Sequence, residues 1–290
     1  MNDLPHAEDL FSIVWFGDTK DIIMRADAGH LLGVIYRQKG KSSWNIEAED
    51  ILRAALDIIK KNINHQTKEH LQLKSRILNS LGATLLQTSE LFDQAEALKK
   101  LEEAEVILYE SFELEQDILE DKQGTAQVLN TLATLYLRLY LYSGEEAFVY
   151  RALEFIDKAL EWSSQDSDDI DLVYHLNTKA DILIARKSNN DLDEAERLLN
   201  QCIEVNKKIR DKKTQAIAYY RMAKVFLGRG DEESIKKSIT WASHSIGVWD
   251  KLDNAIGKRD SMELIANGYD LLNEPSKASY WRRKAYNSNA

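Results

Sequence analysis

Residues 128–138 read VLNTLATLYLR, and this stretch holds the pattern that decides the fold. A small residue, Ala133, is followed three positions later by a bulky one, Tyr136. Five other stretches align with it: HLLGVIY, SLGATLL, TKADILI, RMAKVFL and LIANGYD. Their small residues recur at intervals of 43 to 51 positions: Gly33, Gly82, Ala133, Ala180, Ala223 and Ala266. Self-similarity at a nearly constant interval predicts a repeat protein.

A second helix is predicted after each of these stretches. Small, large and small residues recur there with offsets of four and three, which places them on one helix face. The triplets are Ala48/Leu52/Ala55, Ala97/Leu101/Ala104, Ala152/Ile156/Ala159, Ala195/Leu199/Cys202, Ile235/Ile239/Ala242 and Ala278/Arg282/Ala285. Small residues let two helices approach closely while the large one fills the gap, so the pattern predicts six packed helix pairs.

The composition fits a chain built from helices alone. Its two prolines are Pro5 and Pro275, so no proline interrupts a helix between them. Strong helix formers, above all Leu, Ala, Glu and Lys, are abundant. We expect a capping helix within residues 1–18, followed by one continuous repeat domain over residues 19–290. The longest predicted helix covers residues 91–120.

The net charge of −10 argues against nucleic acid or an anionic membrane as the main partner, because both require a basic face. A single cysteine, Cys202, excludes an internal disulfide and suits a reducing compartment. The N-terminal residues lack the basic segment and apolar run of a signal peptide. We therefore expect a cytoplasmic protein. Cys202 occupies a small position of a triplet and is predicted to be a buried thiol.

Several short motifs approach known chemistry without reaching it. Residues 40–42 resemble the end of a phosphate-binding loop, but the preceding glycine, Gly33, is too distant. The spacing of His65, Glu69 and His70 fits no zinc-protease motif. The acidic cluster over residues 166–171 lacks the glycine and glutamate of a calcium loop and is interpreted as a helix start. We expect neither enzymatic activity nor a metal or cofactor.

The two-helix pattern resembles the tetratricopeptide repeat (TPR), and Leu32-Gly33 followed by Tyr36 comes close to that family's first-helix core. The resemblance covers about residues 19–287. The intervals exceed the usual repeat length, and the family's tryptophan and closing proline are absent. The chain is therefore similar to long-repeat members such as kinesin light chain and bacterial peptide-pheromone receptors. The resemblance implies an all-α, right-handed α-α superhelix, a TPR-like solenoid of about six helix pairs.

Three units carry an asparagine three residues before the small position: Asn79, Asn130 and Asn177. The resemblance places this position on the concave groove, where such an asparagine binds the main chain of an extended peptide. A side-chain amide is suited to that task because it offers a donor and an acceptor together. We expect the three amides to be solvated in the free chain. Family groove positions also hold Arg37, Arg76, Gln87, Arg138, Tyr174, Tyr220 and Lys224. The alternatives for the asparagines are a hydrogen bond to a neighbouring helix inside the solenoid and simple exposure to water.

The favoured function is an adaptor or scaffold that binds another protein or an extended peptide through the concave groove. An alternative is a peptide-sensing regulatory subunit that controls a separate effector protein. A third hypothesis is a scaffold that forms homo-oligomers through its chain ends, using Trp15, Phe16 or Trp281. The sequence names no partner.

Overall fold

The computed structural model describes residues 4–39, 42–61, 67–163 and 170–288. Every regular element in these ranges is a helix, and no strand is present among them. Two of the short motifs weighed above, the loop at residues 40–42 and the His65 motif, lie partly outside the described residues. Most of the acidic cluster at 166–171 lies outside them as well.

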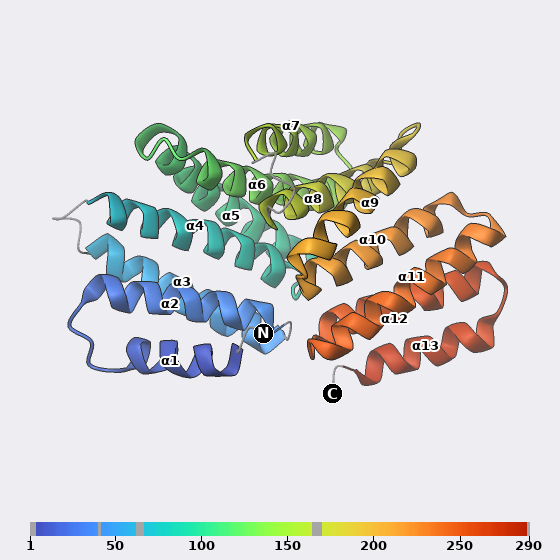
Figure 1. Cartoon of the computed structure of the whole chain (residues 1–290), viewed down its shortest axis with the longest axis horizontal. Helices are drawn as coiled ribbons and strands as arrows, with labels where there is room; N and C mark the ends of the chain where they lie inside the picture. Colours follow the sequence, from blue (N-terminus) through green and yellow to red (C-terminus); the bar gives the residue numbers. More distant parts are fainter. Residues whose placement is uncertain (1–3, 40–41, 62–66, 164–169, 289–290) are drawn as a thin grey trace. The chain divides into compact units, whose positions relative to one another are not determined.

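Thirteen α-helices follow one another among the described residues (Figure 1). They are α1 (Leu4–Phe16), α2 (Ile22–Gln38), α3 (Ser42–Lys61), α4 (Lys68–Ser89), α5 (Gln94–Glu113), α6 (Lys122–Ser143), α7 (Glu146–Trp162), α8 (Ile170–Arg186), α9 (Asp191–Ile209), α10 (Lys212–Arg229), α11 (Glu232–Lys251), α12 (Ala255–Leu271) and α13 (Pro275–Asn287). A π-helical turn, η1 (Leu114–Ile118), extends α5, so the helix predicted over 91–120 is α-helical only in part. Side-chain caps such as Asp93 and Asp231 begin several helices.

The predicted repeat register is confirmed by burial. The first four triplets are completely buried, and so are Ala133, Ala180, Ala223 and Ala266. Gly33 and Gly82 lie where two helices touch: a methyl group on Gly33 would lie 2.7 Å from Cγ of Leu52. In the last triplet Ala278 and Ala285 are buried, but Arg282 is exposed because it pairs with Asp270 at the surface. The weaker patterns therefore belong to the same architecture.

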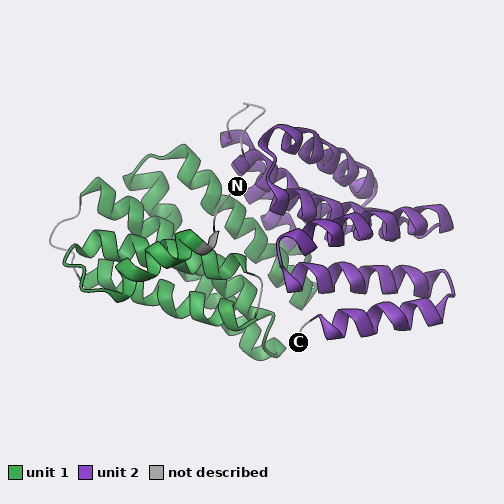
Figure 2. Ribbon diagram, turned by 60° about the horizontal axis from the view of Figure 1, so that its bottom comes forward, with its two compact units in different colours: residues 1–148 green, residues 149–290 purple. Residues whose placement is uncertain are grey.

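The chain divides into two compact units, residues 1–148 and 149–290 (Figure 2). The first unit contains α1 to α6, and α1 packs on α2 with Trp15 against Gly29. The boundary between the units lies in the first turn of α7, and the second unit contains the rest of α7 and α8 to α13. Helix α2 packs on α3, α4 on α5, α8 on α9, α10 on α11 and α12 on α13, as the triplets predict. One continuous solenoid over residues 19–290 stays a prediction.

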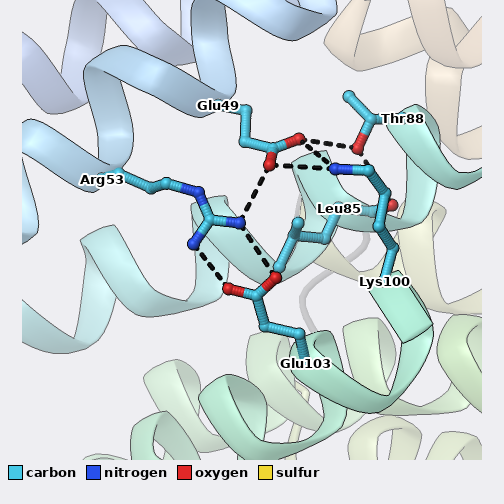
Figure 3. Close-up of polar contacts among 6 residues, drawn as sticks. All are labelled: Glu49, Arg53, Leu85, Thr88, Lys100 and Glu103. Atoms are coloured by element: carbon cyan, nitrogen blue, oxygen red, sulfur yellow. Dashed lines mark hydrogen bonds and ion pairs between the residues drawn. The ribbon is translucent and has the colours of Figure 1, made fainter. Parts of the chain in front are cut away.

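A charged cluster joins the second helices of the first two repeats (Figure 3). Glu49 of α3 accepts hydrogen bonds from Arg53 at 2.9 Å, from Lys100 of α5 at 3.0 Å and from Thr88 of α4 at 2.9 Å. Arg53 also donates to Glu103 of α5. Burial disfavours the charged carboxylate of Glu49, but these hydrogen bonds outweigh burial and lower its pKa. Three helices are thereby held in register by one buried carboxylate.

Candidate functional site

The first helices of successive repeats lie side by side in the N-terminal unit, where α4 contacts both α2 and α6. One repeat position, three residues before the small residue, holds His30 on α2, Asn79 on α4 and Asn130 on α6. Equivalent residues on parallel-running repeats occupy the same face of the stack. These three side chains therefore form a row across α2, α4 and α6, which we call the α2–α4–α6 row.

Unpartnered acceptors concentrate along these first helices. Asn79 and Asn130 are half-buried, and the Oδ1 atom of each is buried without a hydrogen-bond partner. The Oε1 atom of Gln87, two turns along α4, is in the same state. An unsatisfied buried carbonyl is costly, by about 1–3 kcal/mol. A ligand that donates hydrogen bonds to these oxygens would recover that cost, provided that the half-buried side chains turn their oxygens toward it.

Asn177 belongs to α8 in the second unit, and its environment differs. Its side chain is only 2% exposed, and Nδ2 donates to the main-chain oxygen of Val173 at 2.9 Å. The expectation that the three amides would be solvated is therefore wrong for Asn177, because its own helix takes its donor. It is also wrong for the Oδ1 atoms of Asn79 and Asn130, which are buried. The Oδ1 atom of Asn177 nevertheless lacks a partner, as in Asn79 and Asn130.

Sequence reasoning missed Asp27 and His30, which continue the row on α2. Nε2 of His30 lies 3.0 Å from Oγ of Ser80 on α4, and Nδ1 lies 4.0 Å from Oδ1 of Asp27. Arg76 of α4 lies 3.5 Å from the same oxygen of Asp27. Burial, together with the charges of Arg76 and Arg37, lowers the pKa of His30 to about 3. His30 is therefore neutral near pH 7. The sequence did contain one signal for His30, because it stands three residues before Gly33, as Asn79 stands before Gly82.

Neutral His30 makes the stability of the N-terminal unit depend on pH. Its pKa is about 3 in the folded chain and about 6.5 when unfolded, so the unfolded chain binds the extra proton between these values. Stability due to His30 is thus present above about pH 6.5 and is lost as the pH falls. Between pH 7 and pH 5 we expect a loss of about 2 kcal/mol from this group.

The matched variant is His30→Asn, which installs the residue found at this position in the next two repeats. Urea unfolding at pH 7 and pH 5 measures how much free energy of unfolding each protein loses over this range. The loss should be smaller in the variant than in the wild type by about 2 kcal/mol. An equal loss in both proteins would mean that His30 titrates normally.

The remaining predicted groove residues are largely engaged within the chain. Arg76 pairs with Asp27, and Arg138 of α6 forms an ion pair with Glu90. In the second unit, Lys224 of α10 pairs with Asp181 of α8 at 2.7 Å and lies over the ring of Tyr220. Arg37 lies close enough to His30 to affect its charge, and Tyr174 is half-buried on α8. Arg76 and Arg138 are thus each placed beside an acidic side chain.

Asp27, His30 and Ser80 are the residue types of a serine hydrolase triad, but their arrangement does not suit that chemistry. The Asp27–His30 separation of 4.0 Å is too long for the orienting hydrogen bond. A histidine with a pKa near 3 is a weak base at neutral pH. Ser80 lies inside α4, where backbone N–H groups bond to the preceding turn and cannot form an oxyanion hole.

The described ranges contain no candidate metal centre. No group of three His, Cys, Asp or Glu side chains in these ranges is placed to hold a metal ion. Cys202 is completely buried, as predicted, and burial raises the pKa of its thiol to about 12. None of the described helices is long and apolar enough to cross a membrane.

Similarity to known proteins is visible in the fold and not in the sequence. No protein-family model matches the chain, and no curated protein matches it. The crystal structure of BtubC from P. vanneervenii aligns with a TM-score of 0.53 over 82% of this chain and 90% of that one, at 13% identity. A Pyrococcus horikoshii STAND (signal transduction ATPase) protein with a tetratricopeptide repeat sensor aligns with the same score. That alignment covers 99% of this chain and 40% of the other, at 14% identity.

TPR-like repeats of a kinesin light chain-like protein from Podosopora anserina align with a TM-score of 0.49 over 78% of this chain and 98% of that one, at 15% identity. The fold assignment rests on the two structures with the higher score. Together with the helix pairs and their buried triplets, they identify a TPR-like repeat fold. The predicted fold class, an all-α superhelix of helix pairs, is confirmed.

Proposed function

We propose that this chain is a protein-binding scaffold, and that the α2–α4–α6 row binds the main chain of a partner polypeptide. The observation that carries the proposal is the concentration of buried, unpartnered acceptors at Asn79, Gln87 and Asn130. Groups of this kind are normally satisfied in a folded protein. They occur here on helices that contact one another, in a register that repeats.

Acceptors select a ligand with donors, and an extended peptide is the simplest one. Its backbone presents an N–H group at each non-proline residue, whatever its side chains are. Packed helices lie about 8–10 Å apart, and an extended chain advances about 3.3 Å per residue. One amide on each first helix would therefore meet about every third residue of the partner. Such binding reads the main chain and tolerates many sequences.

The charges around the row suit a ligand whose contacting groups are uncharged. Asp27 faces Arg76, and Glu90 faces Arg138, so these four ionised groups already have opposite charges next to them. His30 is neutral at physiological pH. Neutral amide donors can approach such a surface without leaving a charge unpaired. The proposal therefore requires neither an acidic nor a basic partner.

Peptides selected from a random library on the 290-residue chain provide the probe. We expect Asn130→Ala to weaken their binding, measured by titration calorimetry, about two- to ten-fold, because one hydrogen bond contributes about 0.5–1.5 kcal/mol. The double variant Asn79→Ala/Asn130→Ala should bind more weakly still. Asn200→Ala, at an exposed asparagine of α9, is the control and should bind as the wild type does.

A second measurement separates main-chain recognition from side-chain recognition. Methylation of single peptide nitrogens removes one N–H donor at a time, and it should weaken binding at about every third position by a similar factor or more. Alanine replacement of the peptide side chains should have smaller effects. Wild-type affinity in the folded double variant would remove the α2–α4–α6 row from the binding site.

A further inference from the structure

The outward face of α1 is apolar where a surface helix is normally polar. Its exposed positions are His6, Asp9, Leu10, Ile13 and Phe16, which follow the spacing of one helix face. Ile13 is 70% exposed and Phe16 71%. Trp15, which the sequence placed among the association residues, is instead buried against Gly29. A row of large exposed apolar side chains on one helix face is characteristic of an interaction surface.

Helix α13 also exposes large aromatic residues. The charged residues of α13 are basic, whereas those of α1 are acidic. Tyr280, Arg283 and Tyr286 follow one another at intervals of three, as Leu10, Ile13 and Phe16 do on α1. Tyr280 is 54% exposed and Tyr286 81%. Trp281 is only half-buried and packs edge-on against Tyr280. Tyrosine and arginine are enriched at the centres of protein interfaces.

The two faces are complementary in charge. Helix α1 contains Glu8 and Asp9 and no Lys or Arg, whereas α13 contains Lys277, Arg282, Arg283 and Lys284 and no Asp or Glu. Glu8, Lys277 and Arg282 already form ion pairs within the chain. Asp9 and Arg283 are exposed and form no ion pair with any residue that the structure describes. Together with Lys284, which lies over the ring of Trp281, they are the charges left to attract a partner.

We propose that the α1 stripe of one copy packs against the α13 stripe of a second copy. The apolar residues Ile13 and Phe16 would cover Tyr280 and Tyr286, and Asp9 would approach the cations of α13. Pairing two α1 stripes would bring acidic faces together, and pairing two α13 stripes would bring basic faces together, which is unfavourable. The contact is therefore heterologous. It concerns a different surface from the α2–α4–α6 row and does not depend on the proposed function.

A heterologous contact has a consequence that a symmetric one lacks. Each bound copy still offers one free α1 stripe or one free α13 stripe, so association continues unless the rotation closes a ring. Sedimentation velocity of the 290-residue chain should show an average mass that rises with concentration. The rise should be smaller in high salt, because exposed charges are screened.

Two blocked variants test the pairing directly. Ile13→Ser/Phe16→Ser removes the apolar part of the α1 stripe, and Tyr280→Ser/Tyr286→Ser removes that of the α13 stripe. Each variant alone should sediment as a monomer. An equal mixture should form a dimer and stop there, because only one intact α1 stripe can meet one intact α13 stripe. Val106→Ser, at a position of α5 that is 71% exposed, is the control and should assemble like the wild type.

All substituted positions are at least half exposed, so the helix content and the melting temperature should be unchanged. A wild-type chain that remains monomeric at every concentration would overturn the proposal. A mixture of blocked variants that remains monomeric would overturn it too. Association of the α13-blocked variant alone would show that α1 pairs with another α1, which also contradicts the proposal.

Discussion

Replacement of Leu108 by alanine is expected to lower the free energy of unfolding of the N-terminal unit by about 2–5 kcal/mol. Leu108 of α5 is completely buried and packs directly on Gly82 of α4. A methyl group on Gly82 would lie 2.6 Å from Cγ of Leu108, which is far inside van der Waals contact. The leucine fills the space that the missing side chain of glycine leaves open. Removing it creates a cavity at a helix crossing.

The same contact predicts a strong coupling. Gly82→Ala should destabilise by about 1–3 kcal/mol through overpacking, although alanine favours a helix more than glycine does. In the double variant the new methyl group occupies part of the space that Leu108 leaves. We therefore expect the double variant to lose less stability than the two single variants lose together, by about 1 kcal/mol or more. Urea unfolding measures these losses.

Gly247 provides the control because it lies in α11 with no other side chain within 4 Å of a methyl group there. Gly247→Ala should stabilise the chain by up to about 1 kcal/mol. Additive losses at Gly82 and Leu108 would contradict the repeat register, since they would show that the two residues do not touch.

The second large effect is expected at Glu49. Glu49→Ala should cost about 3 kcal/mol, because it removes the shared acceptor of Lys100, Arg53 and Thr88. The side chain of Lys100 is only 18% exposed and would be left without its carboxylate partner. The estimate lies at the low end for a buried ion pair because Arg53 reaches solvent and keeps Glu103.

Glu103→Ala is the matched control. Its carboxylate binds the same Arg53, but its side chain is 42% exposed, and the expected loss is below about 1 kcal/mol. Thermal or urea unfolding of the two variants measures the difference. Equal losses would show that burial of Glu49 does not determine the strength of the cluster.

Low pH should weaken the same cluster. Hydrogen bonds lower the pKa of Glu49 below its ordinary value despite its burial, so its contribution is present above that ordinary value. The contribution is lost as the pH falls and the carboxylate accepts a proton. The pH dependence of Glu49 thus has the same sign as that of His30 and lies at lower pH.

The repeat architecture could be predicted from the sequence alone. Gly33, Gly82 and the alanines of the triplets recur because two helices can approach closely only where side chains are small, and that requirement is visible in one chain. The inert state of Cys202 followed from the same register. The shared position of Asn79 and Asn130 was visible as well, since side chains at one repeat position occupy one face.

The partners of those side chains, in contrast, became known only from the folded structure. His30 contacts Ser80 across 50 positions of sequence, and Arg76 and Arg138 lie beside Asp27 and Glu90. Asn177 shares the register of Asn130 but is buried and bonds to its own helix. The physical reason is that spacing along a helix fixes the direction of a side chain, whereas its partners and its burial depend on which helices pack against that face.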